Sequence, residues 1–175
     1  MDACIYLTLP ISDINLINYQ QLNKDVLGEP VVKTHITICG FRMKQRSTIQ
    51  EIKNNLDQVA RVFPKIKVST EDIVYNKTTK IVKLQLSSCS EKKIIEMQHK
   101  IKDKFRTNRV LEVIEMKTRP HITLFRNSEH EDIEKDLKVK KIGRLKKEIN
   151  KFEIMFWDTL QNAIFSQLKN YYIYF

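Results

Sequence analysis

The chain has 175 residues, of which 42% are hydrophobic and 30% are charged, with only three glycines and four prolines. This balance is typical of a globular protein and excludes a linker-rich or low-complexity chain, so we expect a single domain over residues 1–175. Lysine and arginine number 31 against 21 acidic residues, a formal net charge of +10. The excess favours an anionic partner, nucleic acid or nucleotide ahead of membrane, although a merely basic surface is the simpler interpretation.

The three cysteines, Cys4, Cys39 and Cys89, are widely spaced within apolar runs. An odd number without a Cys-x-x-Cys pair predicts reduced core residues of an intracellular protein and gives a zinc site no starting point. Asp2 stands where a signal peptide carries positive charge, and the first apolar run ends by Pro10. Nothing approaches the roughly 20 apolar residues of a membrane span, so we expect a cytosolic protein with no membrane association.

The first third of the chain is expected to form a strand, a helix, a second strand and a second helix, in that order. Residues 3–9 are β-favouring and stop at Pro10, and Ser12 can cap a helix that ends near Gly28, with its apolar residues at Ile14, Ile17, Leu22 and Val26. A strand is expected over residues 32–39, terminated by Gly40. Ser47 or Thr48 then begins a helix that reaches Pro64, with a clear apolar stripe at Ile49, Ile52, Leu56, Val59 and Val62 or Phe63.

From residue 65 to 88 the apolar period changes to two, which predicts a hairpin with strands at 66–68, 73–75 and 81–86 and a turn at 76–79. Ser90 can cap a second strongly striped helix, with apolar residues at Ile94, Met97, Ile101 and Phe105. Short strands are expected at 110–116 and 120–126.

The remaining sequence is charged and then aromatic. Residues 128–150 are acidic first and basic afterwards, which predicts a solvated face or loop with a short helix near its start. Residues 152–157 and 171–175 return to strand composition, and their aromatic side chains are typical of a core or a sheet edge. Strands interleaved with helices in this order predict an α+β domain with a mainly antiparallel or mixed sheet.

Two of the expected strands carry the same motif: a basic residue, any residue, His, Ile, Thr and an aliphatic residue. The first copy contains Lys33, His35 and Thr37, and the second contains Arg119, His121 and Thr123. Alternation along a strand places the basic residue, His and Thr on one face and the aliphatic residues on the other. A repeat of this kind indicates two similar halves that face each other across a cleft.

The motif residues suit acid–base chemistry at a phosphodiester. Imidazole has an unperturbed pKa of about 6.5 and can both take and give a proton near neutral pH. One histidine can withdraw a proton from an attacking hydroxyl while the other protonates the leaving oxygen. Thr37 and Thr123 can donate to non-bridging phosphate oxygens, and Lys33 and Arg119 would add positive charge at the rim. No cluster at metal-ligand spacing accompanies them, so we expect neither metal nor cofactor.

A single His-x-Thr on a strand is usually structural, and the case for chemistry depends on the two matching copies. The other histidines have no companion motif: His99 lies off the apolar stripe of its helix and His130 sits in the charged stretch.

The paired His-Ile-Thr-Ile and His-Ile-Thr-Leu, each preceded by strand and helix, resemble the signatures of the 2H phosphoesterase superfamily. The resemblance implies a bilobal α+β fold, with two antiparallel or mixed sheets, flanking helices and pseudo-twofold symmetry around a central cleft. It also implies metal-independent cleavage or formation of phosphoesters involving a ribose 2′ oxygen. Carried onto this chain, His35 and His121 would be the acid–base pair, and Thr37 and Thr123 would hold the phosphate.

Within the superfamily, residues 4–16 and the composition look most similar to the branch that degrades 2′,5′-linked oligoadenylates, which includes coronavirus accessory proteins, the carboxy-terminal domain of rotavirus capping enzymes and a domain of a mammalian kinase-anchoring protein. The implied role is removal, in the host cytoplasm, of the second messenger that activates the host's latent ribonuclease. Tyr6 is then a candidate for stacking an adenine. Bacterial-type RNA phosphodiesterases and ligases usually carry an Arg or Phe after each motif, a pattern that Arg126 fits in the second copy and residues 39–41 fit only loosely.

Two other functions fit the same residues. A 2H phosphoesterase could act on a 2′,3′-cyclic nucleotide, a cyclic phosphate at an RNA end, or a cyclic oligonucleotide. In a different class, a basic RNA-binding module with structural histidines would bind in a salt-dependent way without cleavage. Histidine-triad hydrolases are disfavoured because they need histidine at Thr37 and Thr123, and three scattered glycines cannot form a phosphate-cradling loop.

Overall fold

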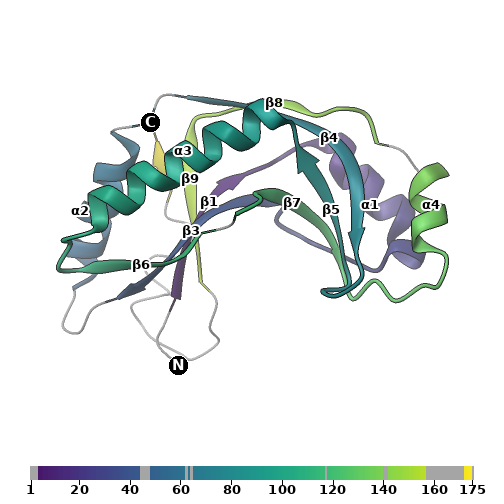
Figure 1. Cartoon of the computed structure of the whole chain (residues 1–175), viewed down its shortest axis with the longest axis horizontal. Helices are drawn as coiled ribbons and strands as arrows, with labels where there is room; N and C mark the ends of the chain where they lie inside the picture. The colour runs from purple at the N-terminus through teal and green to yellow at the C-terminus, as the bar shows by residue number, and fades with distance from the viewer. Residues whose placement is uncertain are drawn as a thin grey trace.

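A curved sheet with helices packed against it forms the body of the molecule (Figure 1). The computed structural model describes residues 4–43, 48–61, 63, 65–116, 118–139, 142–156 and 172–174. Its helices are α1 (Ile14–Leu27), α2 (Ile49–Ala60), α3 (Ser88–Phe105) and α4 (Ile133–Val139). Its strands are β1 (Cys4–Pro10), β2 (Glu29–Pro30), β3 (His35–Met43), β4 (Ile66–Asn76), β5 (Ile81–Leu86), β6 (Leu111–Met116), β7 (His121–Arg126), β8 (Lys146–Ile149), β9 (Lys151–Phe156) and β10 (Tyr172–Tyr174).

The strands form one ten-stranded sheet in the order β10-β9-β1-β3-β7-β5-β4-β8, with β6 added on β3 and β2 on β7. Every pairing among the described strands is antiparallel, which confirms the predicted α+β class. The two sheets expected from the sequence are the two halves of this continuous sheet, joined where β3 meets β7 at the single residue pair Ile36–Ile122. The two motif strands therefore lie side by side at the centre.

The predicted pseudo-twofold symmetry is visible in the order and pairing of the elements. β1, α1, β2 and β3 are followed later by β5, α3, β6 and β7, so each motif strand ends a strand–helix–strand–strand unit. The short third strands are exchanged between the units, because β2 pairs with β7 and β6 pairs with β3. Each half of the sheet thus contains a strand contributed by the other, which locks the two motif strands against each other.

The core lies between the helices and one face of the sheet. Figure 1 shows α2 at one end of the curved sheet and α1 and α4 at the other, while α3 packs against strands of both halves, β3 and β6 as well as β4 and β5. The aliphatic residues of both motifs are fully buried on the helix-covered face: Ile36, Ile38, Ile122 and Leu124. The predicted stripe of α3 is buried with them, as are Ile52, Leu56 and Val59 of α2. Thr48 caps α2 in a capping box with Glu51, as the sequence allowed.

The stripe predicted for α1 is wrong, although the helix and its end at Gly28 are confirmed. Ile14, Ile17 and Leu22 are exposed by 64%, 45% and 83%, and Val26 is only partly buried. The buried face contains Leu16, Tyr19 and Leu27 together with polar Gln20 and Asn23. Polar residues can occupy it because their amides donate to backbone carbonyls there, Gln20 to Val31 and Leu124 and Asn23 to Tyr19.

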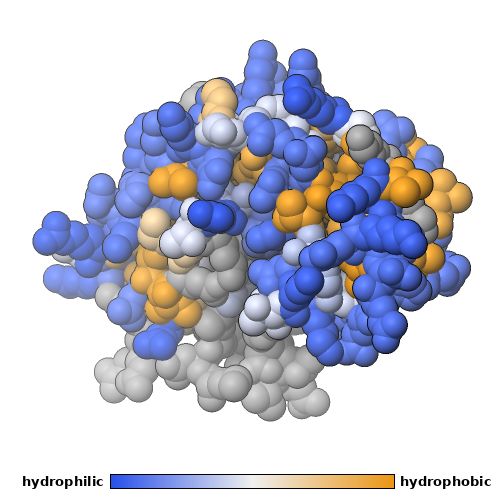
Figure 2. Space-filling view, turned by 45° about the vertical axis from the view of Figure 1, so that its right-hand side comes forward, coloured by the Kyte–Doolittle hydropathy of each residue, from blue (hydrophilic) through white to orange (hydrophobic). Residues whose placement is uncertain are grey.

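Figure 2 accordingly shows a surface on which hydrophilic side chains dominate and hydrophobic ones form separate patches. No helix among the residues described is both long and apolar enough to cross a bilayer.

Several predicted boundaries and environments also need correction. The N-caps are Asp13 and Ser87 in place of Ser12 and Ser90, and Ser90 instead accepts from the backbone N–H of Ser69. The first motif strand begins at His35 and continues through Gly40 to Met43, because β1 and β6 both pair with this segment and a bulge absorbs the glycine.

The charged stretch 128–150 contains α4, as expected, but also the edge strand β8, which pairs with β4. Cys39 is fully buried, and this burial raises the pKa of its thiol. Cys89 is exposed in the first turn of α3, so it is not the core residue that the sequence predicted. The expected strand residues Trp157, Tyr171 and Phe175 lie outside the described residues.

Gly28, which ends α1, is required by its conformation and its surroundings. Its φ of +104° suits glycine, and an added Cβ would lie 2.5 Å from the carbonyl oxygen of Arg126 and 2.8 Å from the hydroxyl of Ser128. This close approach fixes the end of α1 against the end of β7.

We therefore expect Gly28→Ala to lower the free energy of unfolding by about 1–3 kcal/mol, through a strained φ and a steric clash. Gly143→Ala is the matched control, because a Cβ at Gly143 meets nothing within 4 Å. Urea denaturation of the two variants measures the difference. Equal stabilities would contradict the close approach.

Candidate active site

The register of β3 and β7 brings the four motif residues together. Because Ile36 pairs with Ile122 in an antiparallel arrangement, His35 lies across from Thr123 and Thr37 lies across from His121. All four are on the face opposite the buried isoleucines and all are partly exposed. The two histidines are then diagonal neighbours. In an antiparallel pair, the Cα atoms of diagonal neighbours lie roughly 7–8 Å apart, and long side chains can bridge that distance.

Both imidazole rings are held by the same contact. Nδ1 of His35 lies 2.7 Å from the carbonyl oxygen of Lys33, and Nδ1 of His121 lies 2.9 Å from that of Arg119. A carbonyl oxygen only accepts hydrogen bonds, so Nδ1 carries the proton in both neutral rings. Nε2 is then the nitrogen of each ring that can accept or donate a proton in a reaction.

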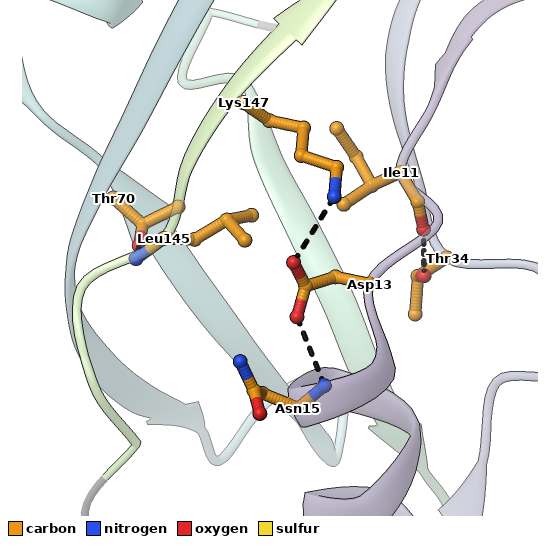
Figure 3. A network of polar contacts seen from close by, with 7 residues as sticks. All are labelled: Ile11, Asp13, Asn15, Thr34, Thr70, Leu145 and Lys147. Atoms are coloured by element: carbon orange, nitrogen blue, oxygen red, sulfur yellow. Dashed lines mark hydrogen bonds and ion pairs between the residues drawn. The ribbon is translucent and has the colours of Figure 1, made fainter.

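The bend that precedes β3 is also fixed through Thr34. Its hydroxyl donates to the carbonyl of Ile11 at 2.6 Å, and the N–H of Ile11 donates to the carbonyl of Thr34 at 2.9 Å. Figure 3 shows this contact beside Asp13, which caps α1 through the N–H of Asn15 and also binds Lys147 of β8. The start of the motif strand is thereby tied to the start of α1.

Two buried glutamines support the motif strands from behind and repeat the pseudo-symmetry. Gln20 of α1 donates to the carbonyl of Leu124 at 2.7 Å, and Gln98 of α3 donates to the carbonyl of Ile38 at 2.8 Å. Each of these carbonyls is three residues after the histidine of its motif. Neither glutamine is predictable from the sequence, because a polar residue beside an apolar helical stripe is expected to face solvent unless its partner strand is known.

The predicted basic residues do not lie on the motif strands, since Lys33 and Arg119 occupy the bends before them. Lys33 forms an ion pair with Glu153 at 3.1 Å, and Arg119 is exposed. Arg126 lies near His35, where its charge acts on the imidazole. A pocket of about 350 Å³ opens beside His35, lined by Glu29, Pro30, Val31, Val32, Lys33, Arg126 and Met155.

Tyr6 lies on β1 two residues before Thr8, and the pairing of Thr8 with Thr37 places this side of β1 next to the motif. Its ring is partly buried, and a contact with substrate remains a prediction. Phe41 belongs to the segment that loosely matched the bacterial-type pattern after the first motif. It is fully buried and packs against Phe105 with ring centroids 4.9 Å apart, so its side chain is part of the core and not of the motif face.

β5 adds polar residues that the sequence analysis did not single out. Lys83 pairs with Thr123 and Gln85 pairs with His121, so both side chains share the motif face. The alternation in residues 81–86 does predict a polar face containing Lys83 and Gln85. The sequence does not show, however, that this strand is the neighbour of the second motif strand, and only that pairing brings the two residues to the motif face.

On the other side, β1 and β9 extend the same face. Thr8 pairs with Thr37 and also with Glu153, and the Thr8 hydroxyl donates to the backbone carbonyl of Glu153 at 3.0 Å. Glu153 is only 5% exposed. A buried carboxylate within an aromatic strand gave no signal in the sequence.

Burial lowers the pKa of His35 from the 6.5 of a free imidazole, against the opposing effects of the Lys33 carbonyl and the Glu153 carboxylate, while Arg126 adds to the lowering. A half-buried histidine of this kind is neutral at neutral pH and can accept a proton. The other histidines are remote from this chemistry in sequence and setting: His99 is exposed on α3, and His130 lies 3.7 Å from Asp136 of α4.

No group of three or more His, Cys, Asp or Glu side chains able to hold a metal ion occurs among the described residues. The groups on the motif face are imidazoles, hydroxyls, the side chains of Lys83 and Gln85, and the Glu153 carboxylate.

Comparisons with solved structures identify the fold. A structure described as a phosphoesterase aligns over 100% of this chain and 96% of its own, with a TM-score of 0.62 and 13% identity. E. coli LigT complexed with 3′-AMP aligns over 100% and 96%, with a TM-score of 0.59 and 12% identity. LigT complexed with phosphate aligns over 89% and 88%, with a TM-score of 0.56 and 13% identity. No protein-family model and no curated protein matches the sequence.

The chain thus has the α+β fold shared by these proteins, with a curled antiparallel sheet and flanking helices, as the resemblance of its motifs predicted.

The shared ring contact predicts the tautomers of both histidines. We expect neutral His35 and His121 to be protonated at Nδ1, because each donates to a carbonyl oxygen, and exposed His99 to favour protonation at Nε2. Two-bond ¹⁵N–¹H correlation spectra above pH 8 distinguish the tautomers. An Nε2-protonated ring at either motif position would contradict the geometry.

Proposed function

We propose that the protein is a metal-independent, cytosolic phosphodiesterase that cleaves an ester at a ribose phosphate. The observation that supports this most is the diagonal placement of two imidazoles on one strand pair, each with Nδ1 held by a carbonyl and with a threonine hydroxyl across the strand. Positioned acid and base groups of this kind typically contribute on the order of 10²–10⁴ each to a rate.

In the proposed reaction, Nε2 of His35 acts as the base and Nε2 of His121 as the acid. His35 removes the proton from a ribose hydroxyl, whose oxygen forms a bond to the adjacent phosphorus. The bond from phosphorus to the leaving oxygen breaks, and His121 gives that oxygen its proton. Thr37 and Thr123 donate to the non-bridging oxygens as negative charge develops there. The burial that lowers the pKa of His35 supports its assignment as the base.

Lys83 is placed to assist this step. It pairs with Thr123 across β5 and β7, so the two side chains leave the sheet on the same face, and in the proposed reaction the ammonium adds positive charge near the phosphate. Arg126 supplies a second cation on the His35 side.

The favoured substrate is a 2′,5′-linked oligoadenylate. Its free 3′ hydroxyl lies next to the phosphate, so attack releases the 5′ oxygen and leaves a 2′,3′-cyclic phosphate, with proximity built into the substrate. Support comes from the sequence resemblance to the viral 2′,5′-phosphodiesterase branch and from the net charge of +10. Solved LigT structures also hold ATP and 3′-AMP. Under this proposal the protein would remove the messenger that activates a host ribonuclease, in the cytoplasm of the host.

A second candidate is a 2′,3′-cyclic phosphate at an RNA end or in a nucleotide. The LigT complex with 3′-AMP favours it, because that ligand carries a ribose 3′-phosphate. A substrate panel separates the candidates: 2′,5′-oligoadenylate, 3′,5′-oligoadenylate and a 2′,3′-cyclic phosphate, each with and without EDTA. We expect cleavage of the 2′,5′ linkage that is unaffected by EDTA. Salt-dependent binding without cleavage of any member would contradict the enzymatic proposal.

His35→Ala and His121→Ala should each lower kcat by about 10²–10⁴-fold, because each removes one proton-transfer group. His99→Ala is the control and should keep full activity, since His99 is exposed on α3. Circular dichroism checks that all three variants fold. More than a tenth of the activity remaining in either motif variant would exclude the paired acid–base scheme.

The pH dependence follows from the burial of His35. A base must be unprotonated, so kcat/KM falls as pH drops through the pKa of His35. Because that pKa is lowered, the acid-side midpoint of the profile should lie below 6.5. Initial rates at fixed ionic strength from pH 4.5 to 9 measure it. A midpoint above 6.5 would assign the base elsewhere.

A further inference from the structure

Glu153 is a carboxylate on the motif face that the proposed reaction does not use. Its side chain is 7% exposed, and it lies in β9, two strands away from the first motif strand. Burying a charged carboxylate is costly unless it is paired. Its partner is Lys33, whose ammonium donates to Oε1 at 3.1 Å while the rest of that side chain remains about half exposed.

The same Lys33 holds His35. Its carbonyl oxygen accepts from Nδ1 of His35 at 2.7 Å, so a continuous chain of contacts runs from the Glu153 carboxylate through Lys33 to the imidazole. Glu153 is itself fixed, because its backbone carbonyl accepts from Thr8 and its strand pairs with β1. We propose that Glu153 is a positioning residue of the active site, which anchors Lys33 and thereby holds the His35 ring, and which supplies a negative charge that acts on that ring. The catalytic part of this inference rests on the proposed function.

The two halves of the site differ in this respect. The bend before His121 presents Arg119, for which the described part of the chain places no carboxylate in contact, whereas the bend before His35 carries the Lys33–Glu153 pair. The bend before His35 is therefore tied to a buried carboxylate on β9, whose charge acts on that ring.

The Glu153 charge favours the protonated form of His35. The groups acting on the His35 ring are Glu153 from β9, Arg126 from β7 and the Lys33 carbonyl. His121 of β7 is its diagonal neighbour, and the partly buried Tyr6 lies on neighbouring β1. Burial lowers the pKa of His35, the Glu153 charge raises it and the Arg126 charge lowers it. Removing the Glu153 charge removes a raising effect, so the pKa of His35 falls further and the imidazolium becomes less stable.

The test is an NMR titration of the imidazoles in the wild type, Glu153→Gln and Glu148→Gln. Glu148 is the matched control, since it is half exposed and pairs with Lys65 and Lys67 at the sheet edge. We expect the His35 midpoint in Glu153→Gln to fall by roughly 0.5 pH unit or more, that of His121 to move by less than half as much, and Glu148→Gln to leave both unchanged. An unmoved His35 midpoint in folded Glu153→Gln, or equal shifts at both histidines, overturns the proposal.

A measurement on the unmodified protein covers the case in which Glu153→Gln does not fold. The side-chain carboxyl ¹³C signal of Glu153 should show an inflection at the midpoint of His35, and its absence overturns the proposal. Activity gives a separate readout: the acid limb of kcat/KM in Glu153→Gln should move to lower pH in parallel with the titration. If the His35 midpoint shifts while no substrate of the panel is cleaved by the wild type, the positioning role stands and the proposed function fails.

Discussion

The pairing of β3 with β7 is the constraint on which the rest of the site depends. The two strands meet at the single pair Ile36–Ile122, and this register alone sets the histidines diagonal to each other with a threonine across from each. A slip by one residue would move His and Thr to the core face and the isoleucines to the solvent. Three features oppose such a slip: the buried isoleucines behind the β3–β7 pairing, the exchanged strands β2 and β6, and the glutamines of α1 and α3.

Charge on this face is arranged unevenly over a nearly symmetric backbone. Lys83 lies beside the second motif, whereas Arg126 and the Lys33–Glu153 pair lie beside His35. Two identical imidazoles in identical surroundings would titrate alike, and acid–base catalysis needs one to hold a proton while the other lacks it. At His35, burial and the Arg126 charge lower the pKa, against the raising effects of the Lys33 carbonyl and the Glu153 carboxylate. In the proposed reaction this local electrostatic environment favours the base role for His35, while the duplicated strands supply the geometry.

The sequence predicted what depends on local pattern: the α+β class, the stripes of α2 and α3, the hairpin of β4 and β5, and the motif residues on two strands. It could not predict what depends on pairing between distant strands. Lys83 and Glu153 join the face of the motif residues only because β5 neighbours β7 and β9 neighbours β1. The error in α1 has the same origin, because Gln20 and Asn23 are buried by carbonyl partners while isoleucines face the solvent. The pattern of apolar residues contains no information about those partners.

We propose that Nε2 of His35 and Nε2 of His121 act on one phosphorus, and a crystal structure with bound vanadate is the decisive experiment. Vanadate resembles the five-coordinate phosphorus of the transferring group. We expect one vanadate that lies within hydrogen-bond distance of both Nε2 atoms and of the hydroxyls of Thr37 and Thr123. A vanadate held by one histidine alone, or bound away from this face of the sheet, would contradict it.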